Sequence, residues 1–432
     1  MNTYEKVIHY TRGKLAHPGI QKHSRNMGWM FFSRIASLVV AFITTAYIAR
    51  HLGPTNYGQL SYAISFTGLF GFLASLGIDQ ILYRDLIRYP EKRDVYMGTA
   101  LALRLAAGII TVVLCTASAY IWSPKDVSLI LIFLVSLTFV FGSFLLLGYE
   151  FQAEAKSKYP SIFSTIIIIF LNILKILVIF NDEGVIYLAG LIVLEPILYA
   201  LGYWYLRTRE YGSLKNLKFD GLVAISILKD SFPLIFASAF VAASARIDQV
   251  MIKNMMDTES VGLYDSAVRI SELLYFVPNI IITALFPAII NSKKVSDELY
   301  YKRTKKLFVL VVGISIFLAI PTALLSKYLI TIIFGAGFIG AFPVLQIYVW
   351  SNIGAAMSIL VGSFLVAENM TKIISLTTFC GMITNVILNL ILIPKYGMSG
   401  AAFASLISYT IPFLSVFFFK KTRQLALNIF KI

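Results

Sequence analysis

The sequence has few charged residues. Asp, Glu, Lys and Arg make up 14% of its 432 residues, whereas hydrophobic residues make up 58%. Soluble proteins carry about 25% charged and about 45–50% apolar residues, so the composition excludes an ordinary soluble enzyme or binding domain. Mean hydropathy is +0.79, and apolar runs recur near the length of about 20 residues that crosses a bilayer. We therefore expect an all-α polytopic membrane protein, because a membrane barrel would show alternating strands of about ten residues.

The residues that usually form metal, redox and nucleotide sites are also scarce. Cys115 and Cys380 both lie in apolar runs, so we interpret them as small buried hydrophobes. The four His residues lie outside the apolar runs, and no HExxH or CxxC spacing occurs. Gly335 and Gly337 are not followed by Gly-Lys-Ser/Thr, which argues against a phosphate-binding loop. We expect no cofactor, no metal and no enzymatic activity. The N-terminus shows no removable signal peptide.

Twelve apolar segments are long enough to span a membrane. They are predicted at 27–49, 59–82, 96–121, 127–149, 160–180, 185–206, 232–252, 262–290, 307–326, 342–366, 373–393 and 399–419. We expect two lobes of six spans each, 27–206 and 232–419, joined by a cytoplasmic linker, 207–231. The flanking segments 1–26 and 420–432 are expected in the cytoplasm. The loops are too short for a soluble domain, which leaves no room for a nucleotide-binding module.

Basic residues fix the predicted orientation. Most of the 37 Lys and Arg residues lie at the termini and in alternate loops on one side. The loops predicted to be external contain only five: Arg50, Lys125, Lys253, Lys327 and Lys395. Because Lys and Arg are retained in the cytoplasm, both termini are predicted to be cytoplasmic. The basic loops then face anionic membrane lipids, so the net charge of +15 requires no nucleic-acid partner.

A faint internal repeat occurs at a spacing of 204 residues. Ile48, Gly58 and Ala63 match Ile252, Gly262 and Ala267. Each match lies where an odd-numbered span leaves the membrane outside and the next span enters. The repeat would relate spans 1–6 to spans 7–12 as two similarly oriented halves.

Charged residues inside the spans concentrate in the seventh and eighth, which hold Arg246, Asp248, Asp265, Arg269 and Glu272. A charge at the centre of a spanning helix costs about 2.5–3.5 kcal/mol, so such groups indicate partners or a wet cavity. The last three residues share one helical face, which suits either a cavity or a self-neutralised ladder of ion pairs. The other two point about 200° apart. We predict Arg246 toward the substrate and Asp248 as a structural or ion-coupling carboxylate.

Besides Asp79, four further charged residues lie within the earlier spans. Arg34, in the first span, is predicted to line the cavity, although snorkelling to the cytoplasmic surface remains open. For Arg104, snorkelling or a structural ion pair is the favoured interpretation. Lys175 either lines the cavity or snorkels outward, and Glu195 is either a proton site or an inter-helix partner. The predicted substrate-binding residues are Arg34, Arg246, Arg269 and Lys175; the predicted coupling or ion-pairing residues are Asp248, Asp265, Glu272 and Glu195.

The turn after the first span resembles a known family. The run from Ile48 to Ala63 (IARHLGPTNYGQLSYA), continued by Leu76-Gly-Ile-Asp and Arg84, is similar to Wzx-type polysaccharide flippases of the multidrug/oligosaccharidyl-lipid/polysaccharide exporter superfamily. The pattern Asp248…Gly262-x-Tyr264-x-x-Ala267 is similar to the counterpart in that family's second half. The resemblance implies two six-helix lobes, V-shaped and inverted across a central cationic cavity. Lipid II flippases of the superfamily typically have fourteen spans, which argues against that assignment.

The resemblance also implies a function. It points to transfer of undecaprenyl-pyrophosphate-linked oligosaccharide units, for O-antigen of lipopolysaccharide, capsule or similar glycans, across the bacterial inner membrane by alternating access. Guanidinium groups suit the pyrophosphate because they bind phosphate bidentately. Membrane potential, H⁺ or Na⁺ would drive the cycle, and the glycan polymerase machinery is a further possible partner. Tyr47, Tyr62, Tyr264 and Tyr275 either stack on sugars or pack between helices. The alternatives are a multidrug exporter of the same superfamily and a membrane glycan polymerase or ligase.

Overall fold

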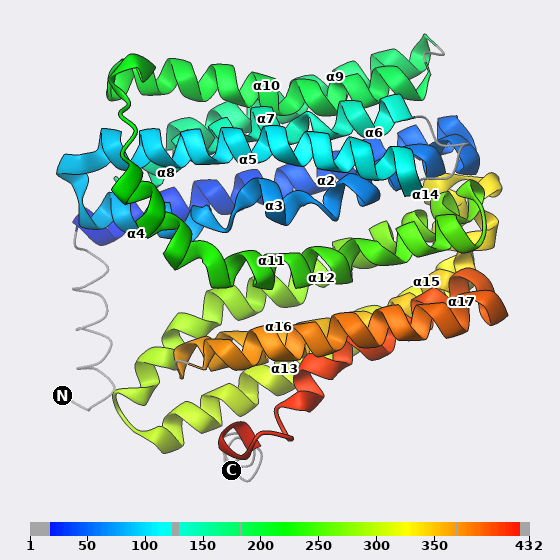
Figure 1. Cartoon of the computed structure of the whole chain (residues 1–432). Coiled ribbons are helices and arrows are strands. Elements are labelled where there is room, and N and C mark those ends of the chain that lie inside the picture. Colours follow the sequence, from blue (N-terminus) through cyan, green and yellow to red (C-terminus); the bar gives the residue numbers. More distant parts are fainter. Residues whose placement is uncertain are drawn as a thin grey trace.

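The structure, a computed structural model, describes residues 18–122, 129–154, 156, 158–181, 184–368 and 370–423. Side chains are described for residue 35 and from residue 37 onward, except at 371 and 372. Every regular element in these ranges is a helix (Figure 1), which confirms the all-α prediction. Eight described helices are long and apolar enough to cross a membrane, or ten if two bent pairs each count as one span. The chain is therefore a multi-pass membrane protein.

The first half of the chain folds into a group of packed helices. Its elements are α2 (Pro18–Gly68), α3 (Gly71–Ser75), α4 (Ile78–Arg88), α5 (Arg93–Trp122), α6 (Leu129–Ser136), α7 (Thr138–Gly142), η2 (Ser143–Leu147), α8 (Gly148–Ala153), α9 (Lys158–Phe180) and α10 (Val185–Glu210), with short 3₁₀ turns η1 (Pro90–Lys92) and η3 (Leu214–Asn216). Elements α6 to α8 follow one another across the predicted fourth span.

The second half forms the other group. Its elements are α11 (Gly221–Met255), α12 (Thr258–Lys293), α13 (Asp297–Leu324), α14 (Ser326–Phe334), η4 (Ala336–Ala341), α15 (Phe342–Tyr348), α16 (Ser351–Ala367) and α17 (Thr371–Ser415). Helix α11 begins eleven residues before the predicted seventh span, inside the predicted linker. The reason is a capping interaction, because the Asp220 carboxylate accepts hydrogen bonds from the backbone N–H groups of Leu222 and Val223.

Two predicted turns are kinks within longer helices. Helix α2 continues from the first predicted span into the second and breaks only at Gly53, whose φ is +73°. Helix α17 does the same between the last two spans, at Gly397 with φ +57°. Glycine adopts positive φ without a side-chain clash, so one residue redirects the chain where a loop was predicted. Pro54 follows the first kink and lacks a backbone N–H to continue the helical ladder.

The second predicted span is itself broken. Leu76 and Gly77 have positive φ angles of 50° and 61°, and the helical segments on either side of the preceding break are bent by 47°. A Cβ at Gly77 would lie 2.9 Å from Cβ of Leu234 on α11. Glycine therefore allows α11 to approach this bend closely, and the bend directs α4 along the first turns of α11.

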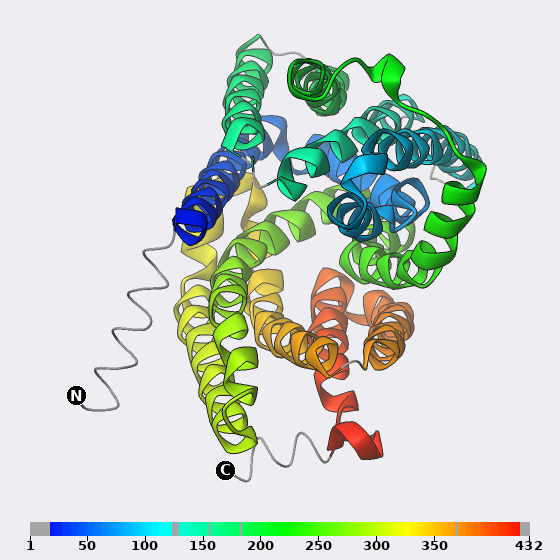
Figure 2. The same cartoon turned by 90° about the vertical axis from the view of Figure 1, so that its left-hand side faces the viewer.

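The buried core shows how the halves meet. The largest apolar cluster combines both halves, with Tyr62 and Ala63 of α2 beside Val261, Tyr264 and Ala267 of α12. Two smaller clusters lie apart from it: one around Leu82 on α4, and one around Val311 on α13. In Figure 1 the two groups of helices meet near α14 and diverge toward α4 and the start of α13. Figure 2, viewed from the diverging end, shows the first-half helices above those of the second half.

Loops predicted to share a side of the membrane lie together. At one end, the Arg50 guanidinium donates to the carbonyl of Ile332, and Met256 packs near Gly397. At the other end, the N–H of Lys218 donates to the carbonyl of Asp94. These contacts pair loops that are predicted to lie on the same side; the number of spans and the side of each loop stay predictions.

Candidate functional site

The site is organised by a close crossing of α2 and α12. A Cβ at Gly58 would lie 1.9 Å from the carbonyl oxygen of Thr258, and one at Gly262 would lie 2.1 Å from that of Pro54. These contacts are reciprocal at the repeat spacing of 204 residues, so the two glycines of the faint sequence repeat pack on each other. Only glycine permits this close approach of the two backbones. The close approach brings the next turns of α2 and α12 into contact.

Asp265, about one helical turn after Gly262, connects α12 to α2. Its buried carboxylate accepts hydrogen bonds from the hydroxyls of Tyr57 (2.6 Å) and Ser61 (3.1 Å), both on α2. Within the second half it accepts from the Gln249 amide, and it pairs with the Arg269 Nε at 3.2 Å. The contact with Ser61 joins two positions 204 residues apart, so this network also follows the repeat.

Arg269 and Glu272 line a cavity between α2 and α12. The cavity has a volume of about 190 Å³ and is also lined by Leu38, Ala41 and Tyr275. The Arg269 side chain is 27% exposed and keeps its Asp265 ion pair, whereas Glu272 is exposed. The predicted face of Asp265, Arg269 and Glu272 therefore contains one ion pair and one further carboxylate, arranged along a cavity.

Arg246 lies beside this cluster on α11. Its Cγ packs 3.4 Å from the position of a Cβ on Gly68, at the end of α2. Its Nη1 is buried and has no hydrogen-bond partner among the residues that the structure describes. A buried guanidinium nitrogen without an acceptor is costly, so this group is suited to an anionic ligand.

Lys175 and Glu195 lie in a second cavity, within the first half. It has a volume of about 190 Å³ and is lined by α2, α9 and α10. Leu38 and Ala41 of α2 line both this cavity and the one containing Arg269. Arg34 belongs to α2, one turn before Leu38, but its side chain lies outside the described residues. The roles of Lys175, Glu195 and Arg34 stay predictions.

Asp248 has a different environment from Asp265. Its buried carboxylate accepts hydrogen bonds from Tyr264 (2.7 Å), from Asn389 (2.7 Å) and from Ser405. Asn385 in turn accepts from Asn389 at 3.1 Å. All these donors are neutral, and no ion pair with Asp248 occurs among the described residues. As the spacing requires, Asp248 points toward α17, away from the Gly68 contact of Arg246.

The sequence analysis does not identify Asn385, Asn389 and Ser405. It relies on charged residues, and the last four predicted spans contain none. The available signal was the pair of amides four residues apart on one helical face of an otherwise apolar helix. Other charged residues pair structurally: Arg104 forms an ion pair with Asp79. Tyr62 and Tyr264 are buried, 0% and 1% exposed, and Tyr264 also donates to Asp248.

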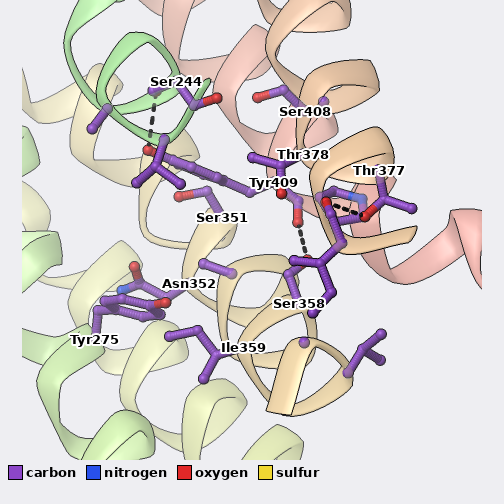
Figure 3. Close-up of a pocket in the computed structure, with 18 of the residues that line it drawn as sticks. Ser244, Tyr275, Ser351, Asn352, Ser358, Ile359, Thr377, Thr378, Ser408 and Tyr409 are labelled. Carbon is purple, nitrogen blue, oxygen red and sulfur yellow. Dashed lines mark hydrogen bonds between the residues drawn. The ribbon is translucent and has the colours of Figure 1, made fainter. Parts of the chain in front are cut away.

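A larger cavity lies within the second half. Its volume is about 530 Å³, and α11, α12, α15, α16 and α17 line it. Figure 3 shows hydroxyl-bearing side chains from α11, α16 and α17 around it, including Ser351, Thr378 and Tyr409. Glu272 and Tyr275 line both this cavity and the Arg269 cavity, so the two adjoin.

The chain is similar to known polysaccharide biosynthesis proteins. Residues 24–293 match the model of the polysaccharide biosynthesis protein family. The capsular polysaccharide biosynthesis protein CapF of Staphylococcus aureus is 23% identical over 409 residues, which cover 92% of this chain and 99% of that protein. The probable flippase AglR of Haloferax volcanii is 30% identical over 182 residues, covering 38% of this chain and 35% of that protein.

Solved structures share the fold. The lipid II flippase MurJ, in an inward closed conformation, matches with a TM-score of 0.70 at 17% identity, covering 93% of this chain and 90% of that one. An inward-facing multidrug resistance transporter of the MATE family, in the MOP superfamily, matches with a TM-score of 0.66 at 12% identity, covering 91% of this chain and 96% of that one. The architecture is therefore that of these exporters.

Proposed function

Because the chain belongs to the polysaccharide biosynthesis protein family, we propose that it is a flippase for undecaprenyl-pyrophosphate-linked oligosaccharide repeat units. It moves them from the cytoplasmic to the outer leaflet of a bacterial inner membrane. One observation carries this proposal: Arg269 lines a cavity where α2 meets α12. Arg246 on α11 is a second candidate, because its buried Nη1 has no hydrogen-bond partner among the described residues. Guanidinium groups match the charge and planar oxygen arrays of a pyrophosphate. The polyprenyl tail stays in the surrounding lipid.

We propose that twelve spans form two six-helix lobes, with the kinks at Gly53 and Gly397 each dividing one long helix into two spans. Both termini then lie in the cytoplasm, and the α2–α12 crossing lies at the outer end. Transport follows from rocking of the lobes about the cavity. It involves no chemical step and no cofactor, and the exported unit is handed to the glycan polymerase machinery.

Ion coupling is assigned to Asp248. Its carboxylate is buried among neutral donors, and the Asn389 Oδ1 beside it has no hydrogen-bond partner in the described part of the chain. This set of oxygens suits a proton or a small monovalent cation, which would balance the buried charge. The membrane potential contributes as well, because moving an anion out of a negative interior gains about 2.3 kcal/mol per charge per 100 mV.

A deletion strain tests the function. Without the protein, the lipid-linked oligosaccharide should accumulate in the inner leaflet, and surface glycan should be lost. Wild-type protein on a plasmid should restore both. If instead the unit reaches the outer leaflet and only polymer is missing, the protein is a polymerase or ligase. If glycan is normal and overexpression confers drug resistance, it is a multidrug exporter.

A further inference from the structure

The 530 Å³ cavity of the second half is separate from the arginines proposed to hold the pyrophosphate. Resting on the proposed function, we infer that this cavity, the sugar cavity, is the subsite for the sugar next to the pyrophosphate, and that it accepts an uncharged sugar. Its volume lies within the range of about 300–1,000 Å³ that is typical of small-molecule sites.

The position of the sugar cavity follows the covalent structure of the substrate. The first sugar is bonded directly to the pyrophosphate, so its site must adjoin the site of the phosphates. Glu272 and Tyr275 line both the sugar cavity and the cavity of Arg269. A pyrophosphate on Arg269 therefore places the next group beside Glu272 and Tyr275, which also line the sugar cavity.

The lining suits a polyhydroxylated ligand. Ser351 is 1% exposed, and its Oγ is buried without a hydrogen-bond partner in the described structure. The Ser358 hydroxyl donates to the carbonyl of Tyr409 at 2.8 Å, and the Tyr409 hydroxyl donates to the carbonyl of Ser244 at 3.4 Å. Each of these hydroxyls keeps lone pairs that accept from a sugar. Figure 3 shows them around the same space as Tyr275 and Thr378.

The charge of the lining sets the class of sugar. Glu272 is the only charged side chain that lines the sugar cavity within the described part of the chain. A uronic acid would bring a second negative charge beside Glu272 with no cation to receive it. Such like-charge contact is unfavourable. The cavity therefore favours neutral or N-acetylated sugars.

The rival occupant is the polyprenyl chain. An alkyl chain would leave the Ser351 hydroxyl without a partner, whereas a sugar hydroxyl can bond to it. The other hydroxyls named above already donate to backbone carbonyls, and a sugar can still donate to their free lone pairs. The lining thus argues for the glycan, and binding of polyprenyl lipids with and without a sugar separates the two occupants.

Gly362 offers a way to fill the sugar cavity without disturbing the fold. It lines the cavity on α16, and a Cβ there would meet no atom within 4 Å. Gly362→Leu therefore places a side chain in the open space, at a helical position where leucine is more favourable than glycine. Gly313→Leu is the matched control, because Gly313 on α13 is equally open but does not line the cavity.

The test measures dissociation constants of the full-length protein in nanodiscs for three probes. These are undecaprenyl diphosphate, the same lipid carrying N-acetylglucosamine, and the same lipid carrying glucuronic acid. Wild type and Gly313→Leu should bind the N-acetylglucosamine lipid about tenfold more tightly than the bare lipid, and should gain nothing from glucuronic acid. Gly362→Leu should remove that preference while binding of the bare lipid stays the same. Ser351→Ala should reduce the preference by about threefold to tenfold.

Each other outcome has its own meaning. Equal binding of all three lipids by wild type overturns the sugar cavity but leaves the flippase proposal intact. Weaker binding of the bare lipid by Gly362→Leu assigns the cavity to the polyprenyl chain and also overturns the inference. Tight binding of the glucuronic acid lipid overturns the restriction to uncharged sugars. Binding of none of the lipids by wild type contradicts the proposed function itself.

Discussion

At the scale of single residues, two buried aspartates on neighbouring helices have opposite environments. Asp265 is paired with Arg269 and bonded to two hydroxyls of α2. Asp248 has only neutral donors, from α12 and α17. A carboxylate with a cationic partner is stabilised as the charged form, whereas one held by dipoles alone responds more readily to a proton or cation. We therefore assign a joining role to Asp265 and a coupling role to Asp248.

Replacing Asp265 with Asn should destabilise the protein. Arg269 would lose its partner in a partly buried site, at a cost of about 1–3 kcal/mol, below the value for a fully buried pair because the arginine is 27% exposed. Thermal unfolding in detergent measures this as a lower melting temperature. Glu272→Gln is the control, because Glu272 is exposed and its change should stay within about 0.5 kcal/mol. An unchanged melting temperature for Asp265→Asn would refute the joining role.

Replacing Asp248 with Asn should leave the fold intact, because no cation loses a partner. The variant should bind undecaprenyl diphosphate as the wild type does, but its export should no longer respond to an imposed H⁺ or Na⁺ gradient. We expect a loss of about tenfold or more in gradient-driven rate, which corresponds to about 1.4 kcal/mol. Initial rates in proteoliposomes, with and without each gradient, provide the measurement. A full response to the gradients in this variant would remove Asp248 from the coupling step.

At the scale of helices, the crossing of α2 and α12 determines where the halves meet. The glycines at 58 and 262 let each backbone contact the other, and the reciprocal pattern makes the crossing nearly two-fold symmetric. The sequence repeat identified these positions but not their contact. The spacing of two matching glycines in the sequence does not show whether they contact each other or face the lipid.

Gly58→Ala should destabilise the crossing, because the new Cβ would lie 1.9 Å from the carbonyl oxygen of Thr258. Backbone atoms must move to relieve this overlap, at a cost of about 1–3 kcal/mol. Gly190→Ala on α10, where a Cβ meets nothing within 4 Å, should be neutral or stabilising by up to about 1 kcal/mol. Melting temperatures of the two variants should therefore shift in opposite directions or differ clearly. Equal shifts would contradict the close crossing.

The sequence predicted helix existence better than helix boundaries. Apolar length predicted a helical multi-pass membrane protein, because the membrane imposes that length, and eight to ten candidate spans are found among the described residues. The kinks at Gly53 and Gly397 were predicted as loops. Glycine is common both in turns and at single kinks with positive φ, so the sequence does not distinguish the two. Within the site, charge marked Asp248, Asp265 and Arg269. Neutral partners such as Asn389, and the hydroxyls that line the sugar cavity, can be recognised only once it is known which helices pack together. The residue pattern within one helix does not contain that information.

At the scale of the whole molecule, the alternation of loops between two ends leads to a topology test. Reporter fusions after residue 423 and within the 210–221 turn should be active only for a cytoplasmic reporter, such as a green fluorescent protein. A fusion between α11 and α12, near Met256, should be active only for an external reporter, such as alkaline phosphatase. The expectation rests on the concentration of Lys and Arg on the cytoplasmic side. Active alkaline phosphatase at the first two positions would invert the proposed topology.

Transport by the reconstituted protein tests the central claim, that arginines between the two halves carry an anionic lipid-linked glycan across the membrane. Proteoliposomes containing undecaprenyl-pyrophosphate-linked oligosaccharide are assayed for the fraction of glycan that becomes accessible on the opposite leaflet. Wild-type protein should transfer it at a rate well above that of protein-free vesicles. The double variant Arg246→Ala/Arg269→Ala should insert normally but fall to the protein-free rate. Transfer by the double variant at the wild-type rate would contradict the claim.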